Sequence, residues 1–164
     1  MVDQYKGMVY TLCLRILRSK ELAEEAAQDA FVKAFRKIAS FESRSTFKTW
    51  LYRITYRTAI DYGRKRRPSV TTNMEAISDN GQESDSSLLQ IQKKEESIMI
   101  QHAIDQLREE ERVVITMYYL QELSIREITE ITDWTQSNIK IKLFRARNNL
   151  REIMSGAHYK SLHL

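Results

Sequence analysis

The chain has 164 residues, a net charge of +4 and 42% hydrophobic residues, which suffices for one or two compact cores. No apolar run reaches membrane-spanning length and the start lacks the apolar core of a signal peptide, so we expect a cytoplasmic protein without membrane insertion. Only four glycines and one proline interrupt the chain, and such breaker-poor sequence with helical periodicity predicts an all-α fold.

A first helical domain is predicted over residues 1–67. Apolar residues at helical spacing predict helices over residues 5–18 and 21–38, and a third helix is expected from about residue 46 to residue 66, before Pro68. The single cysteine, Cys13, has no partner for an internal disulfide, and its apolar neighbours favour a buried thiol. The first domain is therefore a compact three-helix unit.

Residues 68–87 are rich in Ser, Asn and Asp, lack periodicity and predict a flexible acidic linker. A second helical domain is predicted over residues 88–154. Its helices are expected at about residues 88–106, 109–120, 124–132 and 135–154, followed by a frayed tail over residues 155–164. The predicted architecture is thus two small helical domains joined by a linker.

The modest net charge conceals a sharp partition along the chain. Residues 1–67 carry 15 Lys and Arg against 7 Asp and Glu, residues 68–92 carry four acids and no base, and residues 93–164 balance to zero. The cations concentrate in residues 44–67 and 136–151. Two separated basic segments suggest two contacts on one polyanion.

Residues 124–151 have the pattern of a helix-turn-helix. Ser124 and Glu127 form a capping-box signature that starts the first helix. The second helix has an apolar stripe along one face. The other residues of the helix are polar, and residues 136–151 contain five Lys or Arg and no acid. A helix with one apolar face and a cationic remainder suits a nucleic-acid groove. A solvated basic face on an ordinary helical bundle is the alternative for this segment alone.

The third helix of the first domain combines cations with aromatic residues. Residues 44–67 hold eight Lys and Arg and one acid, together with Phe47, Trp50 and three tyrosines. Arg53, Arg57 and Arg64 fall on one helical face. Cations that follow a backbone, interleaved with aromatics that stack on bases, are typical of single-stranded nucleic-acid binding. Phe47 or Trp50 taken alone is better explained as core.

No enzymatic site is expected. His102, His158 and His163 lack metal-ligand spacing, and the scattered glycines form no phosphate-binding loop. We therefore predict no catalytic residue, no metal and no cofactor.

The two basic segments, separated by an acidic linker, resemble a bacterial sigma factor of the extracytoplasmic-function (ECF) branch of the sigma-70 family. The resemblance covers nearly the whole chain and rests on residues 9–17, 23–35, 41–54 and 59–67 in the first domain, and on residues 107–131 and 138–151 in the second. The segment FESRSTFKTWLYRI at 41–54, followed by A-x-D at 59–61, is the most specific part of it.

The resemblance implies a role for each domain. The first, similar to sigma region 2, would dock on the β′ clamp helices of core RNA polymerase and melt the minus-ten promoter element. The second, similar to sigma region 4, would bind the minus-thirty-five element and the β flap. The family also implies an anti-sigma factor as a partner, which could hold the chain at the membrane, and a linker that threads through the RNA path. A soluble spacer is an equally good reading of that linker.

The implied site residues form three groups. Polymerase docking would involve Glu25, Gln28 and Asp29. Minus-ten binding and melting, which requires a base to be extruded and stacked, would involve Arg44, Ser45, Phe47, Trp50, Arg53, Arg57 and Arg64. Minus-thirty-five binding would involve Gln136, Ser137, Lys140 and Ile141 near the start of the recognition helix, with Lys142, Arg145 and Arg147 more suited to phosphate.

Two departures from the family pattern affect specificity. Tyr56-Arg57 stands where the family usually has an Asn associated with the extruded base, and residues 135–139 replace the usual start of the recognition helix. Two other functions remain open from the sequence: a free-standing helix-turn-helix regulator, and a protein-binding module that mimics a sigma factor and sequesters its partners.

Overall fold

The computed structural model describes residues 2–65 and 88–162. All regular structure in these ranges is helical, which confirms the predicted all-α fold. The predicted linker, residues 68–87, lies outside the described residues, as do Arg66 and Arg67 at the expected end of the third helix. None of the described helices has the length and apolar character needed to span a membrane.

The first domain contains α1 (Val2–Leu17), α2 (Lys20–Lys37), a single 3₁₀ turn (Ile38–Ser40) and α3 (Phe47–Lys65). These bounds lie within a few residues of the predicted ones. Ser19 caps α2, because its hydroxyl accepts a hydrogen bond from the backbone N–H of Leu22 at 3.3 Å. The sequence break at residues 18–20 is therefore a helix start as well as a turn.

Small residues allow the three helices of the first domain to pack closely. Ala23, Ala26 and Ala30 form a buried stripe along α2, and this stripe leaves room for the larger buried side chains of Leu12 on α1 and Tyr52 on α3. Cys13 is buried as predicted, and burial raises the pKa of its thiol to about 12. The thiol is therefore protonated and unreactive near neutral pH.

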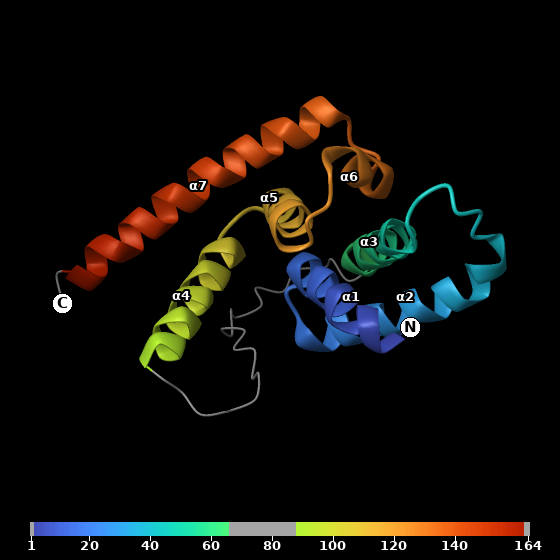
Figure 1. Ribbon diagram of the computed structural model, residues 1–164, viewed down its shortest axis with the longest axis horizontal. Helices are drawn as coiled ribbons and strands as arrows, with labels where there is room; N and C mark the ends of the chain where they lie inside the picture. Colours follow the sequence, from blue (N-terminus) through green and yellow to red (C-terminus); the bar gives the residue numbers. More distant parts are fainter. Residues whose placement is uncertain (1, 66–87, 163–164) are drawn as a thin grey trace.

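The second domain contains α4 (Leu88–Asp105), α5 (Glu109–Ile115), a π-helical turn (Thr116–Leu120), α6 (Ile125–Thr132) and α7 (Gln136–Leu162). Figure 1 shows α7 as a long rod along one side of the molecule, with α5 and α6 between it and the first domain. The helix-turn-helix formed by α6 and α7 thus lies beside the first domain.

One predicted boundary is wrong. The recognition helix was expected to end at residue 154 and to be followed by a frayed tail over residues 155–164, but α7 continues through Leu162. Ser155 and Gly156 suggested the end, yet a single glycine costs a helix only about 1 kcal/mol relative to alanine. No proline follows it, so nothing in this segment forces the backbone out of the helix.

The two domains pack directly against each other. Their buried apolar residues form one continuous cluster, which includes Leu14 of α1 and Leu107 and Val113 near α5. Arg15 forms a buried ion pair with Asp105, and the Arg112 guanidinium donates to the carbonyl of Arg15 at 2.9 Å. The local sequence pattern does not predict this interdomain contact. The contact determines which of the predicted site residues are covered by the other domain.

Candidate nucleic-acid interface

The helix-turn-helix owes its sharp break to specific capping contacts. The hydroxyl of Ser124 accepts the backbone N–H of Glu127 at 3.2 Å, and the Glu127 carboxylate accepts the backbone N–H of Ser124 at 2.8 Å. This is the predicted capping box. Asp133 ends α6 with a φ of 63°, in the left-handed region that Asp tolerates better than most residues. Thr135 then caps α7 through the N–H of Asn138.

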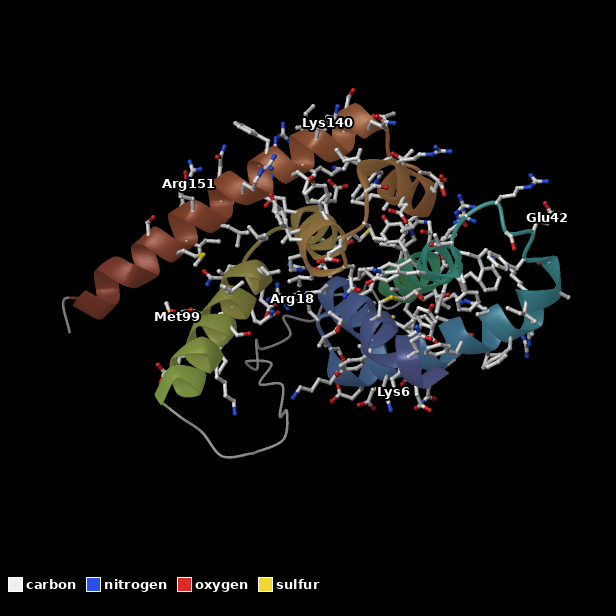
Figure 2. All side chains as sticks on the ribbon, viewed as in Figure 1. Lys6, Arg18, Glu42, Met99, Lys140 and Arg151 are labelled. Carbon is white, nitrogen blue, oxygen red and sulfur yellow. The ribbon has the colours of Figure 1, made fainter. Side chains whose placement is uncertain are left out.

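The recognition helix α7 divides cleanly into two faces. Ile139, Leu143 and Ala146 are buried, so these residues anchor the helix as the apolar stripe predicted. The predicted DNA-contacting residues are all exposed: Gln136, Ser137, Lys140, Ile141 and Arg145. Figure 2 shows Lys140 on the outer side of α7. Phe144 shares this face and is 62% exposed. Sequence reasoning missed it, although it follows Lys140 by one helical turn.

Two of the residues predicted to contact phosphate bind other side chains of the second domain. Lys142 forms an ion pair with Glu110, and its ammonium lies 4.8 Å from the centroid of the Trp134 ring. Its side chain is only 14% exposed. Arg147 donates to the hydroxyl of Tyr119 at 3.1 Å but remains at the surface. Lys142 therefore supports the position of α7, whereas Lys140 and Arg145 extend from its open face.

Aromatic residues gather at the start of α3. The ring centroids of Phe47 and Trp50 are 5.5 Å apart, and Phe41 lies 5.2 Å from Trp50. Tyr5 of α1 completes the cluster, 5.4 Å from Phe47. Phe47 and Trp50 are half-buried, so both residues pack within the domain and remain partly accessible. This is an arrangement on which an unpaired base could stack.

The loop before α3 carries the two remaining polar candidates. Arg44 is exposed and pairs with Glu42 at 2.6 Å, and the hydroxyl of Ser45 points to the carbonyl of Thr46 at 3.4 Å. Both lie next to the aromatic cluster in sequence. The structure thus places Arg44, Ser45, Phe47 and Trp50 at one end of α3.

The cations along α3 are partly occupied by the second domain. Arg53 donates to the backbone carbonyl of Glu130 at 2.5 Å, and Arg57 pairs with Asp133 at 3.1 Å. Arg64, about two turns further along α3, is exposed. Thr49 and Lys48 also reach the second domain, although the sequence did not single them out. Arg53, Arg57 and Arg64 therefore lie on one helix, and Arg53 and Arg57 contact the second domain.

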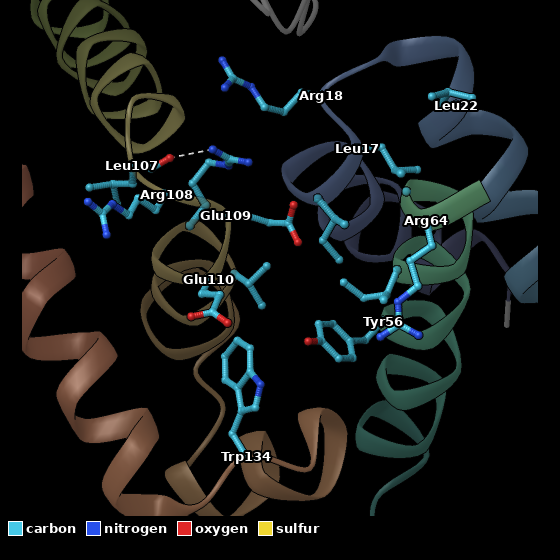
Figure 3. A pocket seen from close by; sticks show the side chains of 15 residues that line it. Leu17, Arg18, Leu22, Tyr56, Arg64, Leu107, Arg108, Glu109, Glu110 and Trp134 are labelled. Carbon is cyan, nitrogen blue, oxygen red and sulfur yellow. Dashed lines mark hydrogen bonds between the residues drawn. The ribbon is translucent and has the colours of Figure 1, made fainter. Parts of the chain in front are cut away.

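A cleft of about 820 Å³ is lined by residues of both domains. Figure 3 shows Tyr56 and Arg64 of α3 on one wall and Glu109, Glu110 and Trp134 on the other. The Tyr56 and Trp134 rings meet edge to face with centroids 6.2 Å apart. Burial, reinforced by the nearby glutamates, raises the pKa of Tyr56 to about 12. Its hydroxyl is therefore neutral at physiological pH.

The predicted polymerase-docking residues lie along α2. Glu25 and Gln28 are exposed, and Asp29 forms an ion pair with Lys33 at 3.0 Å. Apolar side chains follow on the same helix, with Val32 at 44% and Phe35 at 54% exposure. Exposed apolar residues beside an acidic face are typical of a protein-binding surface.

No cluster of His, Cys, Asp and Glu capable of holding a metal ion occurs within residues 2–65 and 88–162. His102 is exposed at the end of α4. The other two histidines of the sequence, His158 and His163, have no described side chains.

Comparisons with known proteins match both halves of the chain. The family model described as Sigma-70 region 2 matches residues 1–68, and the model described as Sigma-70, region 4 matches residues 97–150. The chain is 35% identical to the ECF RNA polymerase sigma factor SigW of Bacillus subtilis, over 93% of the chain and 86% of SigW. It is 33% identical to the ECF RNA polymerase sigma-E factor of Escherichia coli, over 90% of the chain and 81% of that protein.

Solved structures share the fold. The sigma factor RpoE in complex with the anti-sigma factor NepR, from Bartonella quintana, superposes with a TM-score of 0.70 at 23% identity and covers 94% of both chains. CnrH in complex with the cytosolic domain of CnrY superposes with a TM-score of 0.64 at 17% identity, over 94% of this chain and 85% of CnrH.

Proposed function

The chain belongs to the ECF sigma factors of the sigma-70 family, and from this membership we propose how its two domains share the recognition and opening of a promoter. As a sigma factor it directs RNA polymerase in transcription initiation. The single observation that carries the division of labour is the presence of two cationic helical faces, one in each matched domain: α3 with its aromatic cluster, and the open face of α7.

The α7 face suits duplex DNA. Gln136, Ser137, Lys140 and Ile141 occupy the first turns of the recognition helix, where side chains reach base edges in the major groove. Arg145 and Arg147 lie further along and suit phosphate contacts. Since Lys142 is engaged with Glu110 and Trp134, we assign it to holding α7 in place. The second domain would thus position the protein on the minus-thirty-five element.

The α3 face suits a melted strand. Phe47 and Trp50 provide rings for stacking, and Arg44, Arg53 and Arg57 provide charge for the backbone. Ser45 adds a hydroxyl at the same end, and Arg64 extends the cationic row. Capture of an extruded base would offset the few kcal/mol that unstacking costs. The first domain would thus stabilise the open minus-ten region.

Polymerase docking would use α2. Glu25, Gln28 and Asp29 offer an acidic and polar face to the β′ clamp helices, and the exposed Phe35 adds apolar area to the same surface. The β flap would contact the second domain. Bond-forming chemistry belongs to the polymerase in this scheme, so the chain itself contributes binding and strand opening and needs no metal or cofactor.

RpoE is solved in complex with the anti-sigma factor NepR, and this likeness supports an anti-sigma factor as a partner of this chain. We infer that the protein acts in the cytoplasm, where promoter DNA and polymerase are found. The family membership disfavours a free-standing helix-turn-helix regulator, because the matched region 2 spans residues 1–68 and an effector domain does not require it.

A reconstituted transcription assay tests the proposal. The chain is mixed with core RNA polymerase and fragmented genomic DNA, and the 5′ ends of the transcripts are sequenced. We expect co-elution with core and a shared promoter sequence upstream of the new start sites. Absence of both co-elution and promoter-dependent transcripts would contradict the assignment.

Variants separate the proposed roles within that assay. Trp50→Ala should retain core binding but abolish permanganate-reactive thymines in the minus-ten region. A Glu25→Lys, Asp29→Lys double variant should lose co-elution. Lys37→Ala is the matched control, because it removes an exposed cation from the first domain outside the proposed surfaces. Intact promoter opening by Trp50→Ala would remove the aromatic cluster from the melting surface.

A further inference from the structure

Two large apolar side chains of the recognition helix α7 face solvent. Ile141 is 50% exposed and Phe144 is 62% exposed. Of the large hydrophobic side chains whose exposure the structure describes, Phe144 is the most exposed. The two residues are three positions apart, so they are neighbours on the helix surface. We call them the α7 apolar pair.

The α7 apolar pair lies away from the side of the helix that packs in the core. Ile139, Leu143 and Ala146 are buried. Because each residue turns an α-helix by about 100°, Ile141 is directed almost opposite to these three residues, and Phe144 follows on the same outward side. Neither member of the pair is part of the apolar core that the described residues form. Core packing therefore does not account for the pair.

Polar and cationic side chains surround the pair. Ser137 and Arg145 lie one helical turn on either side of Ile141, and all three are exposed. Lys140 lies one turn before Phe144 and is exposed as well. The first sixteen residues of α7 hold five Lys or Arg and no acid. A partner that fits this surface offers an apolar group among negative charges.

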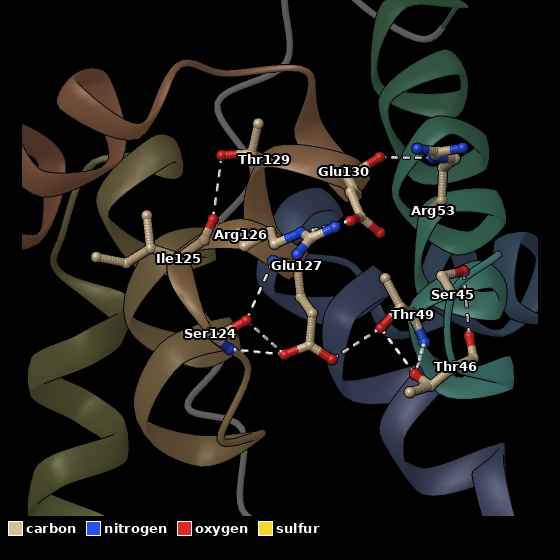
Figure 4. Close-up of polar contacts among 10 residues, drawn as sticks. All are labelled: Ser45, Thr46, Thr49, Arg53, Ser124, Ile125, Arg126, Glu127, Thr129 and Glu130. Atoms are coloured by element: carbon tan, nitrogen blue, oxygen red, sulfur yellow. Dashed lines mark hydrogen bonds and ion pairs between the residues drawn. The ribbon is translucent and has the colours of Figure 1, made fainter.

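The other helix of the helix-turn-helix leaves this surface open. Polar side chains of α6 face α3 instead, as Figure 4 shows: Thr49 donates to the Glu127 carboxylate at 3.0 Å, and Arg53 donates to the Glu130 carbonyl at 2.5 Å. Figure 2 shows Lys140, a neighbour of the pair, on the outer side of α7. The α7 apolar pair is thus accessible to a partner in this arrangement of the domains.

The major groove of duplex DNA contains such an apolar group among phosphates. Its floor presents hydrogen-bonding atoms and one apolar group, the C5 methyl of thymine. The side chains of Ile141 and Phe144 carry no donor or acceptor, so the methyl group is the base feature that they can recognise. They lie in the second and third turns of α7, and the first turns of a recognition helix enter the groove.

The spacing of the pair suits neighbouring base pairs. Residues three positions apart are separated by about 4.5 Å along a helix axis, which is similar to the rise of about 3.4 Å between stacked base pairs. Burial of a methyl group against an isoleucine or a phenylalanine removes apolar surface of both partners from water. One pair of side chains is therefore able to contact methyl groups of two adjacent base pairs.

We propose that Ile141 and Phe144 determine specificity by contacting the C5 methyl groups of adjacent thymines in the minus-thirty-five element. The chain thus selects an element that contains thymine at the positions facing this pair. The inference rests on the proposed binding of duplex DNA by α7. It adds an apolar readout to the polar contacts assigned to Gln136, Ser137 and Lys140.

The test removes the methyl groups from the DNA. The chain is assembled with core RNA polymerase, and the probe is a labelled promoter duplex identified in the transcription assay above. Deoxyuridine replaces thymine within the minus-thirty-five element, which removes the methyl and retains base pairing. The control duplex carries as many deoxyuridines between the two promoter elements. Fluorescence anisotropy should show affinity about fourfold lower for each contacted methyl, and the control duplex should bind as the thymine duplex does.

Protein variants assign the effect to the pair. In Ile141→Ala and Phe144→Ala the loss of affinity caused by deoxyuridine should shrink, because the apolar partner of the methyl is gone. Alanine favours a helix and both side chains are exposed, so the fold is retained. Met154→Ala is the matched control, since Met154 is a 40% exposed apolar residue further along α7. Phe144→Ala should also leave the salt dependence of binding unchanged, whereas Arg145→Ala reduces it.

The outcomes distinguish this inference from the function on which it rests. Equal affinity of the wild-type holoenzyme for thymine and deoxyuridine elements overturns the inference, as does a minus-thirty-five element without thymine. Loss of co-elution with core polymerase in the Ile141→Ala, Phe144→Ala double variant also overturns it, because the pair would then be a protein contact. If Lys140→Ala and Arg145→Ala leave promoter affinity unchanged as well, the binding of duplex DNA by α7 has itself failed.

Discussion

Neighbouring lysines on the recognition helix are expected to behave differently, although the sequence makes them look alike. Lys140 is exposed at the open face of α7, whereas the Lys142 side chain is 14% exposed and engaged with Glu110 and Trp134. We expect Lys140→Ala to weaken binding to a minus-thirty-five duplex by about 1–3 kcal/mol if its ammonium reads a base edge. We expect Lys142→Ala to lower the free energy of unfolding instead.

The expected loss of stability in Lys142→Ala follows from the contacts of the Lys142 side chain. The pair with Glu110 and the position over Trp134 each contribute about 0.5–1 kcal/mol, since both lie partly out of water. Lys142→Ala should therefore lower the free energy of unfolding by about 1–2 kcal/mol, and Lys140→Ala should leave it within about 0.5 kcal/mol. Urea unfolding followed by circular dichroism measures both values.

Salt dependence provides the decisive assay. Each phosphate contact contributes about 0.9 to the slope of log affinity against log salt concentration. Arg145→Ala should reduce that slope by about one contact for any duplex, whereas Lys142→Ala should leave it unchanged. If Lys142→Ala reduces the slope as much as Arg145→Ala and does not alter the free energy of unfolding, the ammonium faces DNA and the reasoning is refuted.

Three further predictions concern stability. Ser124→Ala removes the cap of α6 and should cost about 1 kcal/mol in urea unfolding; an unchanged value would mean that α6 does not need its cap. Burial alone would raise the pKa of Glu127, but hydrogen bonds from Ser124 and Thr49 prevail and lower it; because the pKa is lower in the folded state, the stability it contributes is present above pH of about 4.5 and is lost as pH falls through the folded pKa. Glu127→Gln should flatten that acid dependence in pH-resolved unfolding. Tyr52→Phe removes a fully buried hydroxyl without a hydrogen-bond partner in the protein, so thermal unfolding should show equal or higher stability; a loss above about 1 kcal/mol would reveal a partner for that hydroxyl.

Local pattern predicted most of the fold. The helix positions follow from apolar spacing, the start of α6 follows from the Ser124 and Glu127 signature, and the exposed face of α7 follows from its apolar stripe. The end of α7 was missed because a lone Gly156 is a weak stop signal. Such features depend on residues three or four positions apart, which a sequence displays directly.

The sequence by itself determined that the chain is all-α, that its cations lie in two segments and that those segments belong to a sigma factor. Only the tertiary structure decided which of these cations contact distant parts of the chain. Arg53 and Arg57 meet partners 77 and 76 residues away, and Lys142 meets Glu110 across 32 residues. Periodicity specifies the face of a helix on which a side chain lies, but the oxygen that the side chain meets depends on how the domains pack against each other.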